Sequence, residues 1–314
     1  MAKTRSIVAD YGVYLVLRIF VCVIQGLPLA AGHSFAKALA WLVYKLDKRH
    51  RQVAIDNLKH AFPGRYTDAE IDKLVRAVLR HFCTLAIEII HLPRRFHANN
   101  WRQFVELPQG DVLLRQMLQN RPLMFVTGHF GNWELGGFIL GALGFKTHAI
   151  ARTLDNPFVD HFLRVKFREK TGQQILSKDG DFERIQQVLA EGGVLATLAD
   201  QDAGQRGLFV DFFGRPASTH KAVALLALEH KCPLAVIGTA KIGESMRYAV
   251  MVEDIIFPEE YDGQPEAVRA ITQRFTSALE RLVRRYPEQY FWVHRRWKHQ
   301  PIAKMRRIAK SQAA

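Results

Sequence analysis

Two long apolar stretches occupy the N-terminal part of the chain. Residues 11–27 are apolar except for Arg18 and Gln25, and a second stretch follows as far as about Leu46. The first is close to the roughly 17–25 residues that span a bilayer, although an arginine near its middle is costly unless its side chain snorkels to the interface. We therefore expect a membrane anchor over residues 1–46, as a short span or as a helix embedded in one leaflet. The alternative, an apolar helix of a soluble core, would bury Arg18.

Beyond the anchor, helical and strand patterns alternate. Residues 68–91 place apolar side chains three and four positions apart, and Thr67 is a possible N-cap. Further helices are predicted over 133–143, 155–171, 181–191, 219–231 and 265–286, and strands over 123–127, 147–152, 194–199, 234–241, 248–252 and 289–293. Strands separated by helices predict an α/β sheet with helices on both faces. We expect residues 47–314 to form one catalytic domain with a basic C-terminal tail.

The charge is concentrated at the two ends of the chain. Of the net +14, residues 1–60 contribute 9 Lys and Arg against 3 Asp and Glu, and residues 265–314 contribute 12 against 3. A neutral body with basic ends indicates contact with lipid headgroups, nucleic acid or an acidic protein. The basic residues within 45–51 outnumber Lys3 and Arg5 before the apolar stretches, so we expect the domain that follows on the cytoplasmic side of the membrane.

The three cysteines lie far apart and show no metal-ligand spacing. This pattern excludes a disulfide scaffold and argues against a structural zinc site.

Residues 123–137 carry the candidate chemistry. A short apolar strand leads into a glycine-bordered turn, which places His129 at the carboxyl end of the strand and Glu134 in the first turn of the next helix. A carboxylate at this spacing can fold back to accept the Nδ1 proton of the imidazole and leave Nε2 free as a base. The spacing is not that of a zinc protease helix, and no GxSxG elbow is present. Taken alone, a histidine beside a glycine turn is more often structural than catalytic.

The pattern His129-(x)4-Glu134 resembles the HX4D/E motif of glycerolipid-type acyltransferases, in the glutamate form of the bacterial lipid A biosynthesis acyltransferases. Further segments that resemble this family are 44–51, 57–58, 61–63, 151–157, 200–202, 212–214, 217–219 and 288–296. The resemblance implies transfer of a fatty acyl chain from acyl carrier protein, or alternatively from acyl coenzyme A, to a hydroxyl of a lipid A precursor. Related enzymes acylate mannosylated phosphoinositides and other headgroups with the same pair of residues.

The chemistry that the resemblance implies needs no metal, so we expect no essential metal and no cofactor. The resemblance also implies roles for the two residues of the motif and for the acyl chain. His129 would take the proton of the acceptor hydroxyl, and Glu134 would orient the imidazole. Four apolar side chains that follow the turn are candidates to line an acyl channel, with plain core packing as the alternative: Phe130, Trp133, Phe138 and Leu140.

Four polar residues are candidates for substrate binding. Arg152 would contact a substrate phosphate or the oxyanion, unless it is an ordinary surface arginine. Asn156 belongs to the same segment. Asp200 and Asp202 would position Arg152 or bind a polar acceptor, with a capped turn as the alternative.

Two other classes of protein remain as alternatives. A membrane-tethered nucleic-acid binder would need aromatic side chains interleaved with basic ones over an extended surface, and the neutral middle of the chain offers none, so we expect no nucleic-acid partner. A catalytically silent lipid-binding protein would have lost the motif, and the presence of His129 and Glu134 argues against it.

Overall fold

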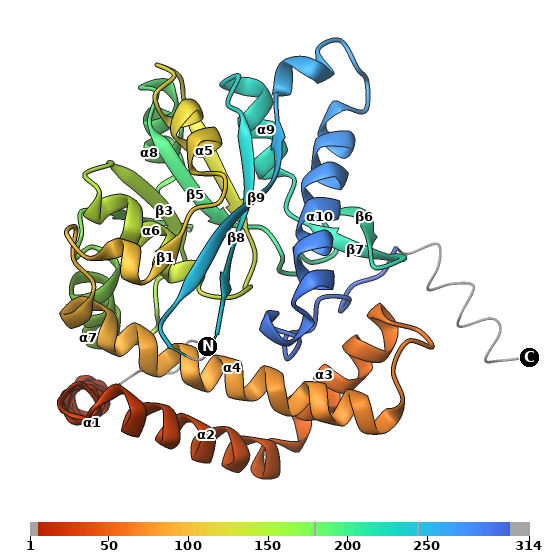
Figure 1. The fold of residues 1–314 in the computed structure, drawn as a ribbon. Helices are drawn as coiled ribbons and strands as arrows, with labels where there is room; N and C mark the ends of the chain where they lie inside the picture. Colours follow the sequence, from red (N-terminus) through yellow and green to blue (C-terminus); the bar gives the residue numbers. More distant parts are fainter. Residues whose placement is uncertain (1–5, 179, 244, 302–314) are drawn as a thin grey trace, which may run out of the picture.

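The computed structural model describes residues 6–178, 180–243 and 245–301, and seven strands of this part form one sheet (Figure 1). The order across the sheet is β1-β9-β8-β2-β5-β3-β4. The strands are β1 (Val105–Glu106), β2 (Leu123–Thr127), β3 (Thr147–Ala151), β4 (Gln174–Ser177), β5 (Val194–Leu198), β8 (Leu234–Lys241) and β9 (Tyr248–Ile256). Neighbouring strands run parallel except for β8 and β9, which are antiparallel.

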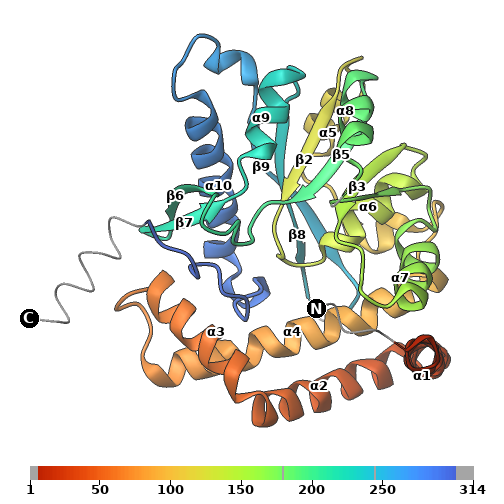
Figure 2. The same cartoon turned by 180° about the vertical axis from the view of Figure 1, so that it is seen from behind.

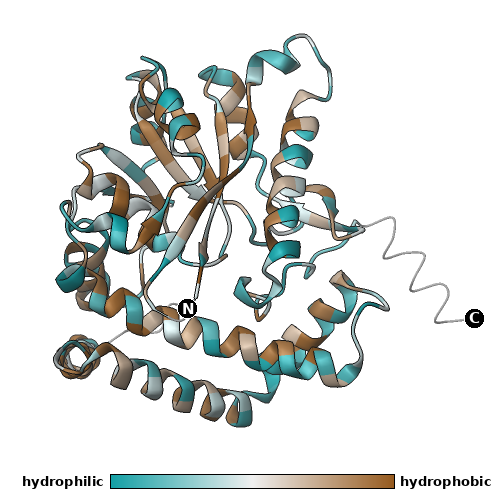
Figure 3. Cartoon of the chain, viewed as in Figure 1, coloured by the Kyte–Doolittle hydropathy of each residue, from teal (hydrophilic) through white to brown (hydrophobic). Residues whose placement is uncertain are grey.

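Helices cover both faces of this sheet, which confirms the predicted α/β class. Met124 and Val126 of β2 point into a core formed with α8 (Phe182–Ala190), α9 (Ala222–Glu229) and α10 (Ala267–Arg285). Leu123 and Phe125 point to the opposite face, where α5 (Gly110–Met117) and α6 (Trp133–Ala142) pack. Successive side chains of a strand alternate between faces, so an entirely apolar β2 requires two such layers. The apolar strands are mostly brown in Figure 3.

The N-terminal helices lie beyond the lower end of the sheet in both ribbon views (Figure 1, Figure 2). They are α1 (Ile7–Gly26), α2 (Leu29–Leu46), α3 (Lys48–Ala61) and α4 (Asp68–Arg95). Helix α4 lies between the sheet and α2. Helix α1 is long and apolar enough, by length and composition, to cross a membrane, and only 17% of its most apolar window is buried.

A buried charge cluster joins α2 to the sheet through α4. Glu88 of α4 is fully buried, and its carboxylate contacts Lys241 Nζ at 2.5 Å and His33 Nε2 at 2.9 Å. The Tyr248 hydroxyl donates a further short hydrogen bond to it. The partners come from α2, β8 and β9. Because a buried carboxylate is stable only when it is paired, these contacts tie α2 to the sheet.

The predicted helix over 68–91 is confirmed and continues to Arg95. Thr67 begins it with a capping box, in which the Glu70 N–H donates to the Thr67 hydroxyl and the Glu70 carboxylate accepts from the Thr67 N–H at 2.8 Å. The predicted helix over 155–171 is divided into α7 (Pro157–Leu163) and a π-helical turn, η2 (Arg164–Arg168).

The prediction of a strand over residues 289–293 is wrong. The chain there forms a 3-10 turn, η4 (Pro287–Gln289), and one isolated bridge between Tyr290 and Phe130. Tyr290 and Trp292 are each only 1% exposed, so the aromatic side chains are buried without a ladder of backbone hydrogen bonds. The hydrophobic pattern of the sequence also did not predict two short 3-10 turns, η1 (Trp101–Gln103) and η3 (Pro258–Tyr261). It did not predict the separate antiparallel hairpin formed by β6 (Leu208–Phe212) and β7 (Arg215–Thr219) either.

Candidate functional site

The turn between β2 and α6 is held by backbone contacts with two other segments. The Gly131 N–H donates to the Gln289 carbonyl, and the Asn132 N–H donates to the Thr239 carbonyl, each at 2.8 Å. The Asn132 side chain then caps α6 by accepting the Leu135 N–H at 3.1 Å. Gly131 has φ +56, and a Cβ there would lie 1.9 Å from the Thr239 carbonyl oxygen. Only glycine fits this position, which fixes where His129 emerges.

Asp200 holds His129 at two points. One carboxylate oxygen accepts the His129 backbone N–H, and the other lies 2.8 Å from Nδ1 of its ring. The expectation that Glu134 accepts the Nδ1 proton is therefore wrong. Gly128 permits the close approach, because a Cβ there would lie 3.1 Å from the Asp200 carboxyl carbon. Among the described residues Nε2 of His129 has no hydrogen-bond partner, so it is the nitrogen left for a substrate proton.

The electrostatics of this pair favour an ion pair within a largely buried site. Burial by itself lowers the pKa of the His129 imidazole, but the charge of Asp200 and the hydrogen bond to it outweigh burial and raise the pKa above its ordinary value. Burial by itself raises the pKa of the Asp200 carboxyl, whereas His129 outweighs this and lowers it strongly. Asp200 therefore remains ionised while His129 gains and loses a proton.

Aromatic rings surround the imidazole. Trp133 packs edge-on against His129 with ring centres 5.1 Å apart, and the Phe291 ring lies 6.0 Å away. His294 stacks on Phe291, and its Nε2 lies 3.3 Å from the Asp200 carbonyl oxygen. Burial lowers the pKa of His294, which favours its neutral form. These rings restrict the access of water to His129.

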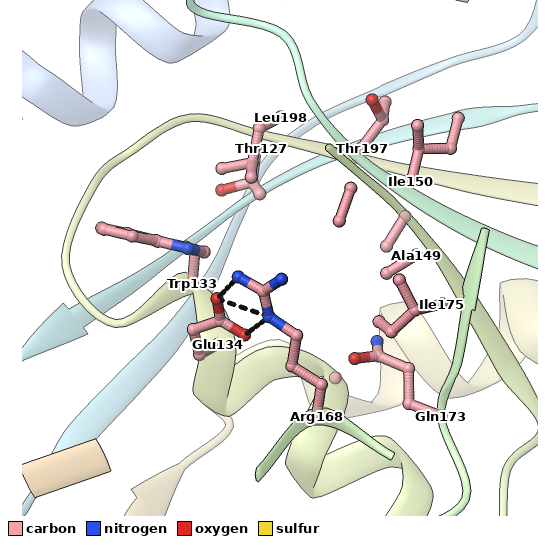
Figure 4. Close-up of a pocket in the computed structure, with 13 residues that line it drawn as sticks. Thr127, Trp133, Glu134, Ala149, Ile150, Arg168, Gln173, Ile175, Thr197 and Leu198 are labelled. Atoms are coloured by element: carbon pink, nitrogen blue, oxygen red, sulfur yellow. Dashed lines mark hydrogen bonds and ion pairs between the residues drawn. The ribbon is translucent and has the colours of Figure 1, made fainter. Parts of the chain in front are cut away.

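Glu134 contacts Arg168 instead of His129. The Arg168 guanidinium donates to both carboxylate oxygens, at 2.6 Å from Nη2 and 3.1 Å from Nε. Figure 4 shows the two side chains pointing toward each other at the side of a cavity of about 70 Å³. Thr127 and Trp133, which lie on either side of His129 in the sequence, also line this cavity. Arg168 was not singled out in the sequence, where it carries no recognisable spacing signal.

An apolar groove begins at the same ion pair. Glu134 and Arg168 also line a hollow of about 330 Å³. Its remaining lining comes from apolar side chains of α1, α4, α6, α7 and η2, including Phe20, Ile90 and Phe138. Of the predicted channel residues, Phe138 lines this groove and Trp133 lines the smaller cavity. Phe130 is core, and Leu140 faces a different apolar cavity.

The structure places the other predicted binding residues outside this cavity. The Arg152 side chain is 76% exposed and lies 3.5 Å from Asp155. The expectation that Asp200 or Asp202 positions Arg152 is therefore wrong. The Asp200 carboxylate contacts His129, and the Asp202 carboxylate contacts His299.

Asn156 and Asp202 have structural hydrogen bonds. The Asn156 side chain caps α7 and donates to the Asp10 carbonyl at 2.9 Å. Asp202 accepts the Gly204 N–H at 3.2 Å and lies 2.6 Å from Nδ1 of His299. The alternative of a capped turn is therefore the one observed for Asp202. Within the described ranges no group of three or more histidine, cysteine or acidic side chains could hold a metal ion.

His129 and the buried carboxylate of Asp200 thus lie at the carboxyl edge of an α/β sheet, near an apolar groove, and ligands of open α/β sheets bind at such an edge. The family model for the bacterial lipid A biosynthesis acyltransferase matches residues 1–299. The chain belongs to this family.

Curated relatives agree with this assignment. The chain is 26% identical over 260 residues to the lipid A biosynthesis palmitoleoyltransferase of Escherichia coli, covering 81% of each chain. It is 25% identical over 231 residues to the phosphatidylinositol mannoside acyltransferase of Mycolicibacterium smegmatis, covering 72% of this chain and 73% of the relative. The solved structure of the 1-acyl-sn-glycerophosphate acyltransferase PlsC from Thermotoga maritima aligns with a TM-score of 0.37 at 14% identity, covering 80% of this chain and 97% of that chain.

Proposed function

We propose that the protein transfers a fatty acyl chain from an acyl carrier protein thioester to a hydroxyl of a lipid A precursor, in a late, secondary acylation. The observation that carries the proposal is the contact between Asp200 and Nδ1 of His129, which leaves Nε2 of the imidazole without a hydrogen-bond partner among the described residues. Membership of the acyltransferase family supplies the reaction class.

The proposed reaction needs one base and forms no acyl-enzyme. Nε2 of His129 removes the proton of the acceptor hydroxyl as its oxygen attacks the thioester carbonyl. The tetrahedral oxyanion then collapses, the carbon–sulfur bond breaks, and the departing thiolate takes the proton from the imidazolium. The products are an ester and the free thiol of the carrier. Asp200 stabilises the imidazolium between the two proton transfers.

Glu134 acts through Arg168 in this proposal. Two-point pairing holds the guanidinium beside the small cavity, where its remaining N–H groups can donate to the oxyanion. The apolar groove that starts at the same pair would hold the acyl tail away from water. Glu134 is therefore a positioning residue for Arg168.

The acceptor and the compartment follow from separate observations. The phosphatidylinositol mannoside acyltransferase among the relatives favours another glycolipid as the alternative acceptor. The apolar helix α1 and the basic residues within 45–51 support association with the inner membrane, with the site on the cytoplasmic face. Acyl coenzyme A is the alternative donor.

Mass spectrometry of membrane lipids from cells with and without the protein tests the reaction. We expect one acyl chain to be missing from lipid A, and to return with the wild-type chain but not with His129→Ala. Loss of an acyl group from a different lipid would reassign the acceptor. If no lipid changes, the protein is a silent lipid binder.

Membrane fractionation tests the compartment. Val16 and Ile19 of α1 are 69% and 64% exposed. Val16→Asp/Ile19→Asp should move the protein to the soluble fraction, whereas Leu118→Asp/Phe182→Asp, at exposed apolar positions outside α1, should not. An unchanged distribution of the α1 variant would place the attachment elsewhere.

A further inference from the structure

The reaction leaves one sequence feature unexplained, the arginine in the middle of the apolar helix α1. Arg18 lies on the same face as Tyr11, Tyr14 and Gln25, and these side chains line a pocket of about 720 Å³ between α1, the end of α4, and α7 with η2. Other faces of α1 expose apolar side chains such as Val16 and Ile19. Arg18 therefore faces a pocket in the protein, and a charged side chain on such a helix marks a binding function more often than a packing one.

The pocket is cationic. Arg94, Lys166 and Lys170 line it together with Arg18, and among the described residues no aspartate or glutamate does. Arg18 donates to the Tyr14 hydroxyl at 2.8 Å, and Arg94 donates to the Gln25 carbonyl at 3.1 Å, so each guanidinium is anchored by a neutral partner. No ion pair to an acidic side chain is formed by any of the four in the part of the chain that the structure describes. Four positive charges that line one hollow make it electropositive, and such a hollow attracts an anion.

Aromatic contacts between α1 and α7 hold the two sides of the pocket in place. Phe158 of α7 contacts Tyr11 edge-on at 5.4 Å, and Phe162 contacts Tyr14 in the same way at 5.8 Å. These contacts fix α1 against α7, while Arg94 binds the carbonyl at the end of α1. The cations are thus carried by elements that hold one another in place, which reduces the entropic cost of binding.

The pocket adjoins the apolar groove of the proposed active site. Val21, Pro93 and Phe167 line both hollows, and Phe167 precedes Arg168, which contacts Glu134. An amphiphile with a negative headgroup and apolar chains fits this arrangement, since the cations lie beside a helix that exposes apolar side chains. A phosphate group matches the fork of guanidinium donors and the two ammonium groups.

We propose that this pocket binds a phosphate group of the acceptor lipid. This inference rests on the proposed acyl transfer for the identity of the lipid as acceptor, but the pocket itself is tested by binding alone. Arg18 and Arg94 would contact the phosphate from the side of α1 and α4, and Lys166 and Lys170 from the opposite side.

Native mass spectrometry of the full-length chain in detergent tests the pocket without turnover. The probes are phosphatidic acid and diacylglycerol with identical chains. We expect the wild-type chain to retain one phosphatidic acid in preference to diacylglycerol, and Lys166→Gln/Lys170→Gln to weaken this retention on the order of tenfold. The matched control is Lys73→Gln/Lys231→Gln, which removes the same charge from exposed positions outside the pocket and should retain the lipid. Equal retention by the two double variants would overturn the proposal.

Kinetics then connect the pocket to the reaction. We expect Lys166→Gln/Lys170→Gln to raise the KM for a phosphorylated acceptor on the order of tenfold at a nearly unchanged kcat, and to have little effect with the dephosphorylated acceptor. A raised KM for acyl carrier protein with unchanged lipid retention would overturn the inference in favour of an acidic protein partner. Loss of lipid retention in a chain that transfers no acyl group would leave the pocket standing and refute the proposed function instead.

Discussion

Asp200 contacts both the backbone N–H and the ring Nδ1 of His129, each at 2.8 Å. The register of the sheet explains how two residues that lie 71 positions apart come together. Thr127 of β2 is paired with Leu198 of the parallel strand β5, so the residues two positions beyond each strand leave the sheet side by side. The same carboxylate therefore fixes the position, the tautomer and the charge of the imidazole.

Asp200→Asn should shift the pH dependence of acyl transfer. In the proposed reaction His129 can act as a base only when Nε2 is unprotonated, and its raised pKa should place the acidic limb of kcat/KM above the usual value of about 6.5. An asparagine carries no charge, so the limb should move to lower pH while kcat falls on the order of 10²–10⁴-fold. The control is Asp202→Asn, whose partner is His299. An acidic limb at the same pH in the Asp200 variant would remove Asp200 from the proposed role.

Glu134→Gln and Arg168→Gln should lower kcat to a similar extent. Because the two side chains act as a unit, the double variant should have nearly the same kcat as either single variant. The acidic limb should move much less than in Asp200→Asn, since Glu134 makes only the weaker electrostatic contribution to the pKa of His129. Steady-state kinetics over a pH range measure both effects. Arg184→Gln, on α8, is the charge-matched control. Additive losses would show that Glu134 has a role independent of Arg168.

Gly131→Ala should destabilise the fold by about 2–4 kcal/mol, because it combines left-handed backbone strain with a clash against the Thr239 backbone. Gly144→Ala is the matched control. Gly144 also has a positive φ, but a Cβ there meets nothing within 4 Å, so only about 1 kcal/mol should be lost. Chemical denaturation of both variants measures the difference. Equal losses would mean that the turn can move away from Thr239.

Lys241→Met should cost about 3–5 kcal/mol, because it leaves the fully buried Glu88 without its cationic partner at 2.5 Å. Adding Glu88→Gln to this variant should restore part of the lost free energy of unfolding, since no buried charge then remains. A double-mutant cycle followed by thermal or chemical denaturation measures the coupling. If the losses of the two single variants simply add in the double variant, the contact between Glu88 and Lys241 contributes no coupling energy.

The sequence was informative wherever a local pattern decides the structure. The apolar run of β2 and the glycine-bordered turn located His129 at a strand end, and Thr67 marked the start of α4. The sequence could not identify Asp200 as the partner of His129, because the order of the strands along the chain gives no indication that β5 lies between β2 and β3. Residues 289–293 have strand composition, but their rings fill the core around Phe130 and Phe212 instead. The division of the chain at residue 46 stays a prediction.

The buried cluster around Glu88 has a practical consequence for any attempt to make a shortened, soluble form of this enzyme. Cutting the chain before residue 47 removes His33 from a carboxylate that has no access to water, and it uncovers Ile87, against which Gly32 is packed. Helix α4 also reaches the turn between β2 and α6, where His81 Nε2 lies 3.4 Å from the Gly131 carbonyl oxygen. Helices α1 and α2 are thus structurally joined to the rest of the fold, and a truncated chain would lose this packing as well as the apolar surface of α1.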